Sequence, residues 1–333
     1  MNGHSGDATV KGVAGSTWRN DTKGITPVNL SDGPAGLRIT QKYKDGDQTY
    51  YQYATAWPIG TLLAQTWDTD QIYAYGEGVG EEMEEFGIGS WLAPGMNIHR
   101  NALCGRNFEY YSEDPVVVGV TGTAATLGVQ KSKGVGVTIK HYALNSQETS
   151  RNRENNTVSE RAIREIYLKG FEMVVKQAQP MAIMTSYNQN NGRPAADDYD
   201  LCTAFARDEW GFQGFVLTDY FGVYGYMNSD QGIRNGTDAM LVAYDTETNH
   251  VKDQKSATGV EAMRQACKNI MYTVVNSRAY DAENLETGLM TWQIAAIAAD
   301  VVLGVGILAL EIVAIKRFRK RLAEEKAAVA VEN

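Results

Sequence analysis

The sequence predicts an α/β protein: a (β/α)8 TIM-like barrel followed by a single C-terminal transmembrane helix. Strand-like and helix-like segments alternate from residue 28 to about residue 277, which is typical of parallel β/α units. The length of this region suits such a barrel, and polar residues end nearly every expected strand. An open doubly wound sheet is the alternative. It is less favoured because an open sheet gathers a ligand only at its switch point, whereas all barrel strands end on one face.

Composition limits the classes of function. The chain has 333 residues, 43% of them hydrophobic, so it can bury one large core. Its net charge of −9 argues against nucleic acid as a partner. The scattered Cys104, Cys202 and Cys267 favour neither a disulfide framework nor a zinc site. Metal, dinucleotide and phosphate-loop motifs are absent from the sequence, so we expect no cofactor and no metal.

Five regions follow one another along the chain. We expect a polar N-terminal segment over 1–27, a barrel domain over 28–280, a linker over 281–289, a transmembrane helix over 290–315 and a basic cytoplasmic tail over 316–333.

The first half of the barrel region alternates apolar runs with helices. A capped acidic helix is expected over 68–86, with Thr66 or Asp68 as its N-cap. The other expected elements are apolar runs at 28–30, 56–63 and 91–98, a small-residue helix at 116–130 and a strand at 135–139.

The second half contains the clearest helix, over 158–178. Thr157 and Glu160 form a capping box there, and apolar residues recur at helical spacing. The remaining elements are strands at 181–184, 215–217 and 238–243, helices at 201–210 and 257–277, and a polar loop at 244–256.

Asp219 ends a short apolar run that glycines bound. A carboxylate at the exit of a buried strand is costly unless it is paired or used, although a lone Asp there can also cap the next helix. Other strand ends carry Asp32, the polar stretch 97–106, Lys140 with His141, and Tyr187. A carboxylate among cations and aromatics suits sugar hydroxyls and an oxocarbenium-like transition state.

Six segments, in order, make the chain resemble the β-glucosidase-like branch of glycoside hydrolase family 3. The resemblance covers about 25–280, the barrel domain of that family. A tyrosine after the KH pair, in place of a KHFPGHG-type loop, sets the chain apart from the N-acetylhexosaminidases of the family. The segments are SDGPAGLR (31–38), APGMNIHRNALCGRNFEYYSEDP (93–115), KHYALNSQETSR (140–151), MTSYNQNNG (184–192), DEWGFQGFVLTDY (208–220) and GTDAML (236–241).

The resemblance implies roles for nine residues. Asp219 matches the retaining nucleophile. The residues expected to bind the sugar or line the nucleophile's side are Asp32, Arg38, Arg106, Lys140, His141, Arg151, Met184 and Tyr187. Alternatives stay open: Arg38, Arg151 and Lys140 could serve in internal ion pairs, and Met184 in the core. We expect Glu109, Glu113 and Asp114 to be structural, bracing Arg106 or capping a helix.

The implied function is a retaining exo-β-glycosidase, β-glucosidase-like, that hydrolyses terminal bonds of an oligosaccharide or β-glycoside. In this branch the general acid/base is usually a Glu of an α/β sandwich domain. An apolar segment directly follows the barrel here, so the order resembles the permuted arrangement, with the sandwich upstream or on a separate chain. The alternative is a catalytically weak or inactive sugar-binding membrane protein, either a pseudoenzyme or a fragment.

The apolar segment 290–315 is long enough to span a bilayer. The KRFRKR cluster after it predicts a cytoplasmic tail, which makes the chain a single-pass cell-membrane protein with an extracytoplasmic barrel and lipid contacts. Asp300 and Glu311 are costly within a span, so a helix packed on the barrel is the alternative. Residues 1–7 lack the features of a signal peptide, and we therefore expect further sequence upstream.

Overall fold

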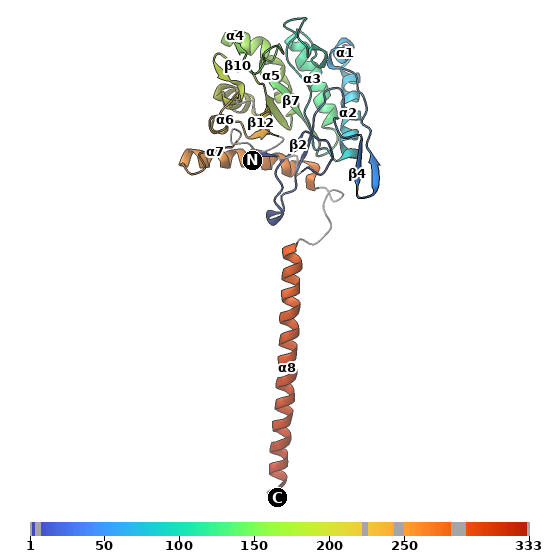
Figure 1. The fold of residues 1–333 in the computed structure, drawn as a ribbon, viewed down its shortest axis with the longest axis vertical. Coiled ribbons are helices and arrows are strands. Elements are labelled where there is room, and N and C mark those ends of the chain that lie inside the picture. Colours follow the sequence, from blue (N-terminus) through green and yellow to red (C-terminus); the bar gives the residue numbers. More distant parts are fainter. Residues whose placement is uncertain (1, 4–7, 222–225, 243–249, 281–290, 332–333) are drawn as a thin grey trace. The chain divides into compact units, whose positions relative to one another are not determined.

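A computed structural model describes residues 2–3, 8–221, 226–242, 250–280 and 291–331. The chain divides into two compact units, Met1–Leu285 and Glu286–Asn333. The first unit contains the barrel and its helices (Figure 1). The predicted linker 281–289 lies outside the described residues, as do residues 243–249 of the predicted strand end and polar loop.

Eight strands of the first unit form one sheet in the order β1-β13-β12-β9-β7-β6-β3-β2. All neighbouring pairs are parallel except β2 and β3, which pair antiparallel. The barrel sheet is nearly but not fully closed, because no ladder joins its two end strands, β1 and β2, among the described residues. The strands are β1 (Asn2–Gly3), β2 (Gly15–Ser16), β3 (Asn29–Ser31), β6 (Ser90–Trp91), β7 (Gly136–Tyr142), β9 (Ala182–Thr185), β12 (Phe215–Tyr220) and β13 (Ala239–Leu241).

The barrel prediction is thus confirmed in its outline and wrong in one part. A (β/α)8 barrel has eight parallel strands, whereas β2 is antiparallel and only two residues long. The segment 1–27, predicted to lack clear elements, contributes β1 and β2. Neither strand is long enough to carry an apolar alternation, so the sequence pattern does not show them.

Helices surround the sheet, and α2, α3 and α5 lie side by side around β7 (Figure 1). A Cβ added at Gly76 or Gly128 would meet backbone atoms of the facing helix, so the small residues let α2 and α3 approach closely. The longer helices are α1 (Gly60–Gln65), α2 (Thr69–Phe86), α3 (Pro115–Val129), α5 (Lys169–Ala178), α6 (Ser229–Asn235) and α7 (Ala257–Asn276), with a π-helix η6 (Asp200–Glu209).

The two helix starts predicted from caps differ in outcome. Asp68 caps α2 as predicted, accepting hydrogen bonds from the backbone of Asp70 and Gln71. The capping box at Thr157 is wrong. Ser159 is the N-cap and accepts from the Ala162 N–H at 3.2 Å, because Glu160 is the first helical residue and not the third. The helix is also divided into α4 (Glu160–Ala162), a π-turn η4 (Ile163–Tyr167) and α5.

Several small elements were not predicted. A hairpin of β4 (Lys42–Asp45) and β5 (Gln48–Tyr51) follows β3. The mixed run 91–98 contributes only β6. Short elements elsewhere are η2 (Asp21–Lys23), η3 (Asn107–Glu109), β8 (Asn155–Asn156), β10 (Gln189–Asn190), β11 (Arg193–Pro194), η5 (Ala195–Asp197) and η8 (Arg278–Tyr280).

The core explains why the strands hold their positions. Leu30, Met184, Phe215 and Leu217 belong to one buried cluster formed mainly by strands. The register sets Leu217 beside Met184 and Ile139 beside Ile183. The last residues of β7 and β12 therefore emerge together at the carboxyl end of the barrel.

The second unit contains one helix, α8 (Thr291–Val331). Its part Ile294–Arg321 is long and apolar enough to cross a membrane. Length and composition support no more than that, so the span over 290–315 stays a prediction.

Candidate active site

A cavity of about 590 Å³ lies at the carboxyl ends of the barrel strands. Its walls come from segments far apart in the chain: the loop after β3, the turn η3 with Arg106 before it, and the ends of β7, β9 and β12. All nine residues predicted for the site line it: Asp32, Arg38, Arg106, Lys140, His141, Arg151, Met184, Tyr187 and Asp219. The structure brings them together, while their roles stay predictions.

Asp219 is the penultimate residue of β12, and its side chain is 14% exposed. One carboxylate oxygen accepts the Tyr220 N–H at 2.7 Å, and the other lies 3.7 Å from Nε2 of His141. Burial raises the pKa of Asp219 above its ordinary value, and the positive charges of Lys140, Arg106 and Arg151 offset part of that rise. The buried carboxylate thus faces cations but has no cation in direct contact among the described residues.

Asp32 and Lys140 form an ion pair at the wall of the cavity. Lys140 Nζ donates to Asp32 Oδ1 at 2.6 Å, and Arg38 donates to Asp32 Oδ2 at 3.1 Å. Lys140 is 3% exposed, whereas Arg38 is 74% exposed. Burial would raise the pKa of Asp32, but Lys140 outweighs it and holds the pKa below its ordinary value. Lys140 and Arg38 therefore both form internal ion pairs, as the alternative to sugar binding predicted, and both also line the cavity.

Arg106 is held by Glu109, whose carboxylate it meets at 2.5 Å. Both side chains are largely buried, and the charge of Asp219 also acts on Arg106. The prediction that Glu109 braces Arg106 is confirmed. Asp114 is likewise structural, since it caps α3.

His141 is the penultimate residue of β7, directly after Lys140, and is 1% exposed. Burial lowers its pKa well below the ordinary range, and the nearby charges of Arg106, Lys140 and Arg151 lower it further. The imidazole is therefore neutral at neutral pH. Its Nδ1 lies 3.2 Å from the Tyr110 hydroxyl and 3.3 Å from Oδ1 of Asn97.

Arg151 closes another side of the cavity. Its guanidinium lies 4.6 Å from the centre of the Tyr187 ring and donates to Glu148 at 2.9 Å. Met184 is 2% exposed and belongs to the strand core, so its packing interpretation holds although it also touches the cavity.

Other lining or supporting residues were missed by sequence reasoning. Phe108 and Tyr220 line the cavity, and Tyr110, Asn145 and Glu148 hold its polar groups. Asn97, within the polar stretch noted at 97–106, holds the backbone of His141 on both sides at 2.8 Å. Aromatics beside strand ends were the available signal for Phe108 and Tyr220. The others act through contacts between distant segments.

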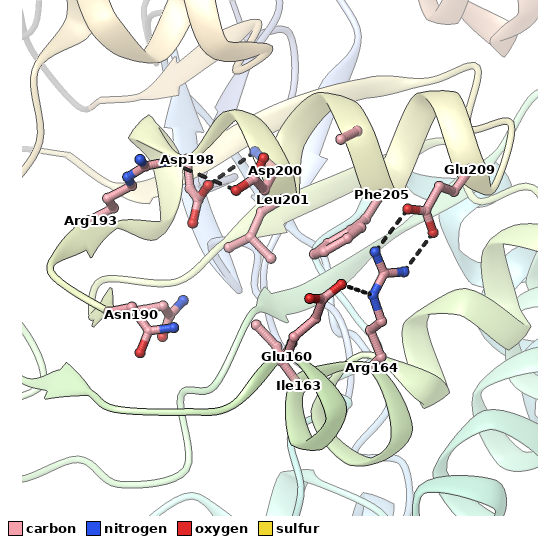
Figure 2. Close-up of a pocket in the computed structure, with 12 residues that line it drawn as sticks. Glu160, Ile163, Arg164, Asn190, Arg193, Asp198, Asp200, Leu201, Phe205 and Glu209 are labelled. Atoms are coloured by element: carbon pink, nitrogen blue, oxygen red, sulfur yellow. Dashed lines mark hydrogen bonds and ion pairs between the residues drawn. The ribbon is translucent and has the colours of Figure 1, made fainter.

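A second cavity, of about 500 Å³, lies between the α4–η4 segment and η6 (Figure 2). Arg164, in its wall, is already paired: it contacts Glu160 at 3.0 Å and Glu209 at 2.7 Å, and it lies 4.2 Å from the centre of the Phe205 ring. None of the nine predicted site residues lines it. Among the described residues, no group of three His, Cys, Asp or Glu side chains could hold a metal ion.

A nearly closed barrel whose strand ends place a carboxylate among cations is typical of barrel enzymes, which have their active sites at this end of the strands. The chain belongs to glycosyl hydrolase family 3, whose N-terminal domain it matches over residues 23–272.

Relatives agree with this assignment. β-Glucosidase A of Butyrivibrio fibrisolvens is 44% identical over 236 residues, covering 69% of this chain and 28% of that protein. An exo-α-(1→6)-L-arabinopyranosidase of Bifidobacterium longum is 44% identical over 202 residues, covering 60% of this chain and 27% of that protein. The structure of β-glucosidase 3B from Thermotoga neapolitana in complex with glucose superposes with a TM-score of 0.74 and 36% identity, covering 88% of this chain and 42% of that one. The chain thus spans less than half the length of these proteins.

Proposed function

We propose that the chain is the barrel part of a retaining exo-β-glycosidase, with a terminal β-glucoside as its first candidate substrate. One observation carries the proposal: Asp219, whose side chain is only 14% exposed, shares a cavity with the Asp32–Lys140 pair, Arg106 and His141. A family that includes proteins named β-glucosidase supports it. Because another relative is named an arabinopyranosidase, the sugar that this chain prefers has to be found by comparing glycoside substrates.

Asp219 would attack the anomeric carbon as its bond to the leaving oxygen breaks, which forms a glycosyl-enzyme. Water would then attack the same carbon and release the sugar with retention. Asp32 and Lys140 offer an acceptor and donors for neighbouring hydroxyls, while Arg106 and the His141 ring add donors on the other side.

The leaving oxygen also needs a proton from an acid about 5–5.5 Å from the nucleophile. The other carboxylates among the described lining residues are Asp32 and Glu109, and each already meets a cation. A carboxylate held ionised by a cation is a poor proton donor. We therefore propose that another segment or chain, such as an α/β sandwich domain, supplies the acid/base.

Trapping tests the nucleophile. A 2-fluoro glycoside with an activated leaving group should label the protein covalently, and peptide mapping should place the label on Asp219. The matched control is Asp230, a half-buried carboxylate in the first turn of α6 that does not line the cavity, whose Asn variant should still be labelled. A label on any residue other than Asp219 would contradict the proposal.

A sugar-binding protein without turnover is the second candidate, since both other cavity carboxylates are ion-paired. An aryl glucoside with a good leaving group needs little protonation. Slow turnover of that compound, lost in Asp219→Ala, supports an enzyme that lacks its acid. Saturable binding without turnover supports the binding protein.

We also propose that α8 anchors the chain in the cell membrane, with the basic tail in the cytoplasm and the barrel outside. The apolar stretch Ile294–Arg321 and the basic cluster at its end support this orientation.

A further inference from the structure

A chain of hydrogen bonds, partly buried at Arg151 and fully buried at Tyr110, links two residues of the cavity wall, Arg151 and His141. Arg151 donates to Glu148 at 2.9 Å, and Asn145 donates to the other oxygen of Glu148 at 3.1 Å. The same Asn145 amide donates to the Tyr110 hydroxyl at 3.1 Å, and that hydroxyl lies 3.2 Å from Nδ1 of His141. The contacts of Asp219 and Asp32 described above involve neither Tyr110 nor Asn145.

The orientation of Asn145 determines where the Tyr110 hydrogen points. A carboxylate only accepts, so the Asn145 atom facing Glu148 is the NH2 group. That group also faces the Tyr110 oxygen, which must accept from it. Burial raises the pKa of Tyr110 far above its ordinary value, so the phenol keeps its hydrogen. Tyr110 is 0% exposed, and among its described partners only Nδ1 of His141 can accept that hydrogen.

Asn97 is the competing neighbour of Nδ1. Its Oδ1 lies 3.3 Å away and would favour a hydrogen on Nδ1. That oxygen already accepts the His141 backbone N–H at 2.8 Å, whereas the Tyr110 hydrogen would lose its acceptor. A buried hydroxyl without an acceptor is the more costly outcome.

We infer that Tyr110 is a positioning residue that fixes His141 in the Nε2–H tautomer. The hydrogen on Nε2 then points toward Asp219 Oδ2, 3.7 Å away, and toward the cavity between them. The opposite tautomer would turn a lone pair on Nε2 toward the carboxylate. The consequence for sugar binding rests on the proposed function, whereas the tautomer itself does not.

The test is to measure which tautomer His141 adopts in the full-length chain. Detergent is added if the chain needs it to stay in solution. The chain has four histidines, so 15N-histidine labelling gives a simple long-range 1H–15N spectrum, and His141→Gln identifies the signals of His141. Wild-type protein should show the proton on Nε2. A proton on Nδ1 in the folded wild-type protein overturns the inference, whatever the activity.

Tyr110→Phe removes only the hydroxyl. With Asn97 Oδ1 as the remaining neighbour, the tautomer ratio should move toward Nδ1–H by roughly fivefold or more, the equivalent of one hydrogen bond. Tyr111→Phe is the matched control, because Tyr111 is buried next to it in sequence and does not line the cavity. An unchanged ratio in folded Tyr110→Phe also overturns the inference.

Kinetics separate the inference from the proposed function. If the chain hydrolyses an aryl β-glucoside, Tyr110→Phe should lower kcat/KM by roughly tenfold, while Tyr111→Phe keeps the wild-type value. Equal kcat/KM in Tyr110→Phe and wild type would refute the functional part. If no glycoside is hydrolysed, the proposed function fails and the tautomer measurement still decides the inference.

Discussion

At the scale of single residues, the cavity balances burial against charge. Burial pushes the pKa of Asp219 up, and three cations around the cavity push it down. Burial lowers the pKa of His141, and the same cations lower it further, which keeps the ring neutral. The proposed role of Asp219 as a nucleophile needs the ionised carboxylate, which these cations favour even where they do not touch Asp219.

The acid limb of activity should therefore report Asp219. Because its pKa lies above 3.8, activity should fall as pH drops through a value higher than that of an ordinary aspartate. Lys140→Met removes the strongest opposing charge and should move the limb to still higher pH, besides lowering activity. The measurement is kcat/KM against pH for an aryl β-glucoside. Lys131→Met, on the outer surface, is the control, and an unmoved limb in Lys140→Met would contradict the assignment.

We expect the Asp32–Lys140 ion pair to contribute to the free energy of unfolding. Asp32→Ala leaves the buried Lys140 ammonium without its carboxylate, and since Asp32 is 31% exposed we expect a loss of about 1–3 kcal/mol in the free energy of unfolding. Adding Lys140→Met should restore part of that loss. Urea denaturation measures both. Equal stability of Asp32→Ala and wild type would show that water solvates Lys140.

At the scale of elements, the strand ends carry the chemistry and the helix starts carry local stability. Each cap is set by the one residue before the first helical turn, so an error of two residues in a predicted boundary assigns the cap to the wrong side chain. That is what separates Thr157 from Ser159.

Paired alanine variants distinguish those two residues. Ser159→Ala should lower the free energy of unfolding by about 1 kcal/mol, because it removes the acceptor for the Ala162 N–H. Thr157→Ala should stay within about 0.5 kcal/mol of wild type. The reverse order of the two losses would restore the capping box.

The sequence predicts those parts of the site that depend on local pattern. Asp219 and Lys140 each end an apolar run, and the few residues before each of them are enough to show that pattern. The role of Tyr110 depends on His141, 31 residues away in sequence, and no spacing rule links them. The strand β2 is equally invisible, because a two-residue strand is defined only by its partner β3.

At the scale of the whole molecule, two compact units follow each other in the chain. The first contains the residues that line the cavity, and the described residues of the second form the helix α8 with its apolar stretch. This division lets anchoring and sugar binding be tested separately.

Fractionation of cells tests the anchor. Full-length protein should sediment with membranes and need detergent for release, while a variant ending at residue 285 should become soluble. Added protease should digest the barrel of intact cells and spare the tail. Soluble full-length protein would refute the anchor, and cleavage of the tail alone would reverse its orientation.

The closing strands of the barrel also order events during synthesis. Asn2 and Gly3 pair with Met240 and Leu241, and Asp219 faces groups as early in the chain as Asp32 within one cavity. A nascent chain whose β12 and β13 are still in the ribosome therefore has no complete pocket. Its strand β1 has no partner until β13 emerges, and such an unpaired strand edge can pair with other chains. Chaperone demand should peak in that interval and fall only after α7 has left the ribosome, because Ile270 and Val274 complete the strand core.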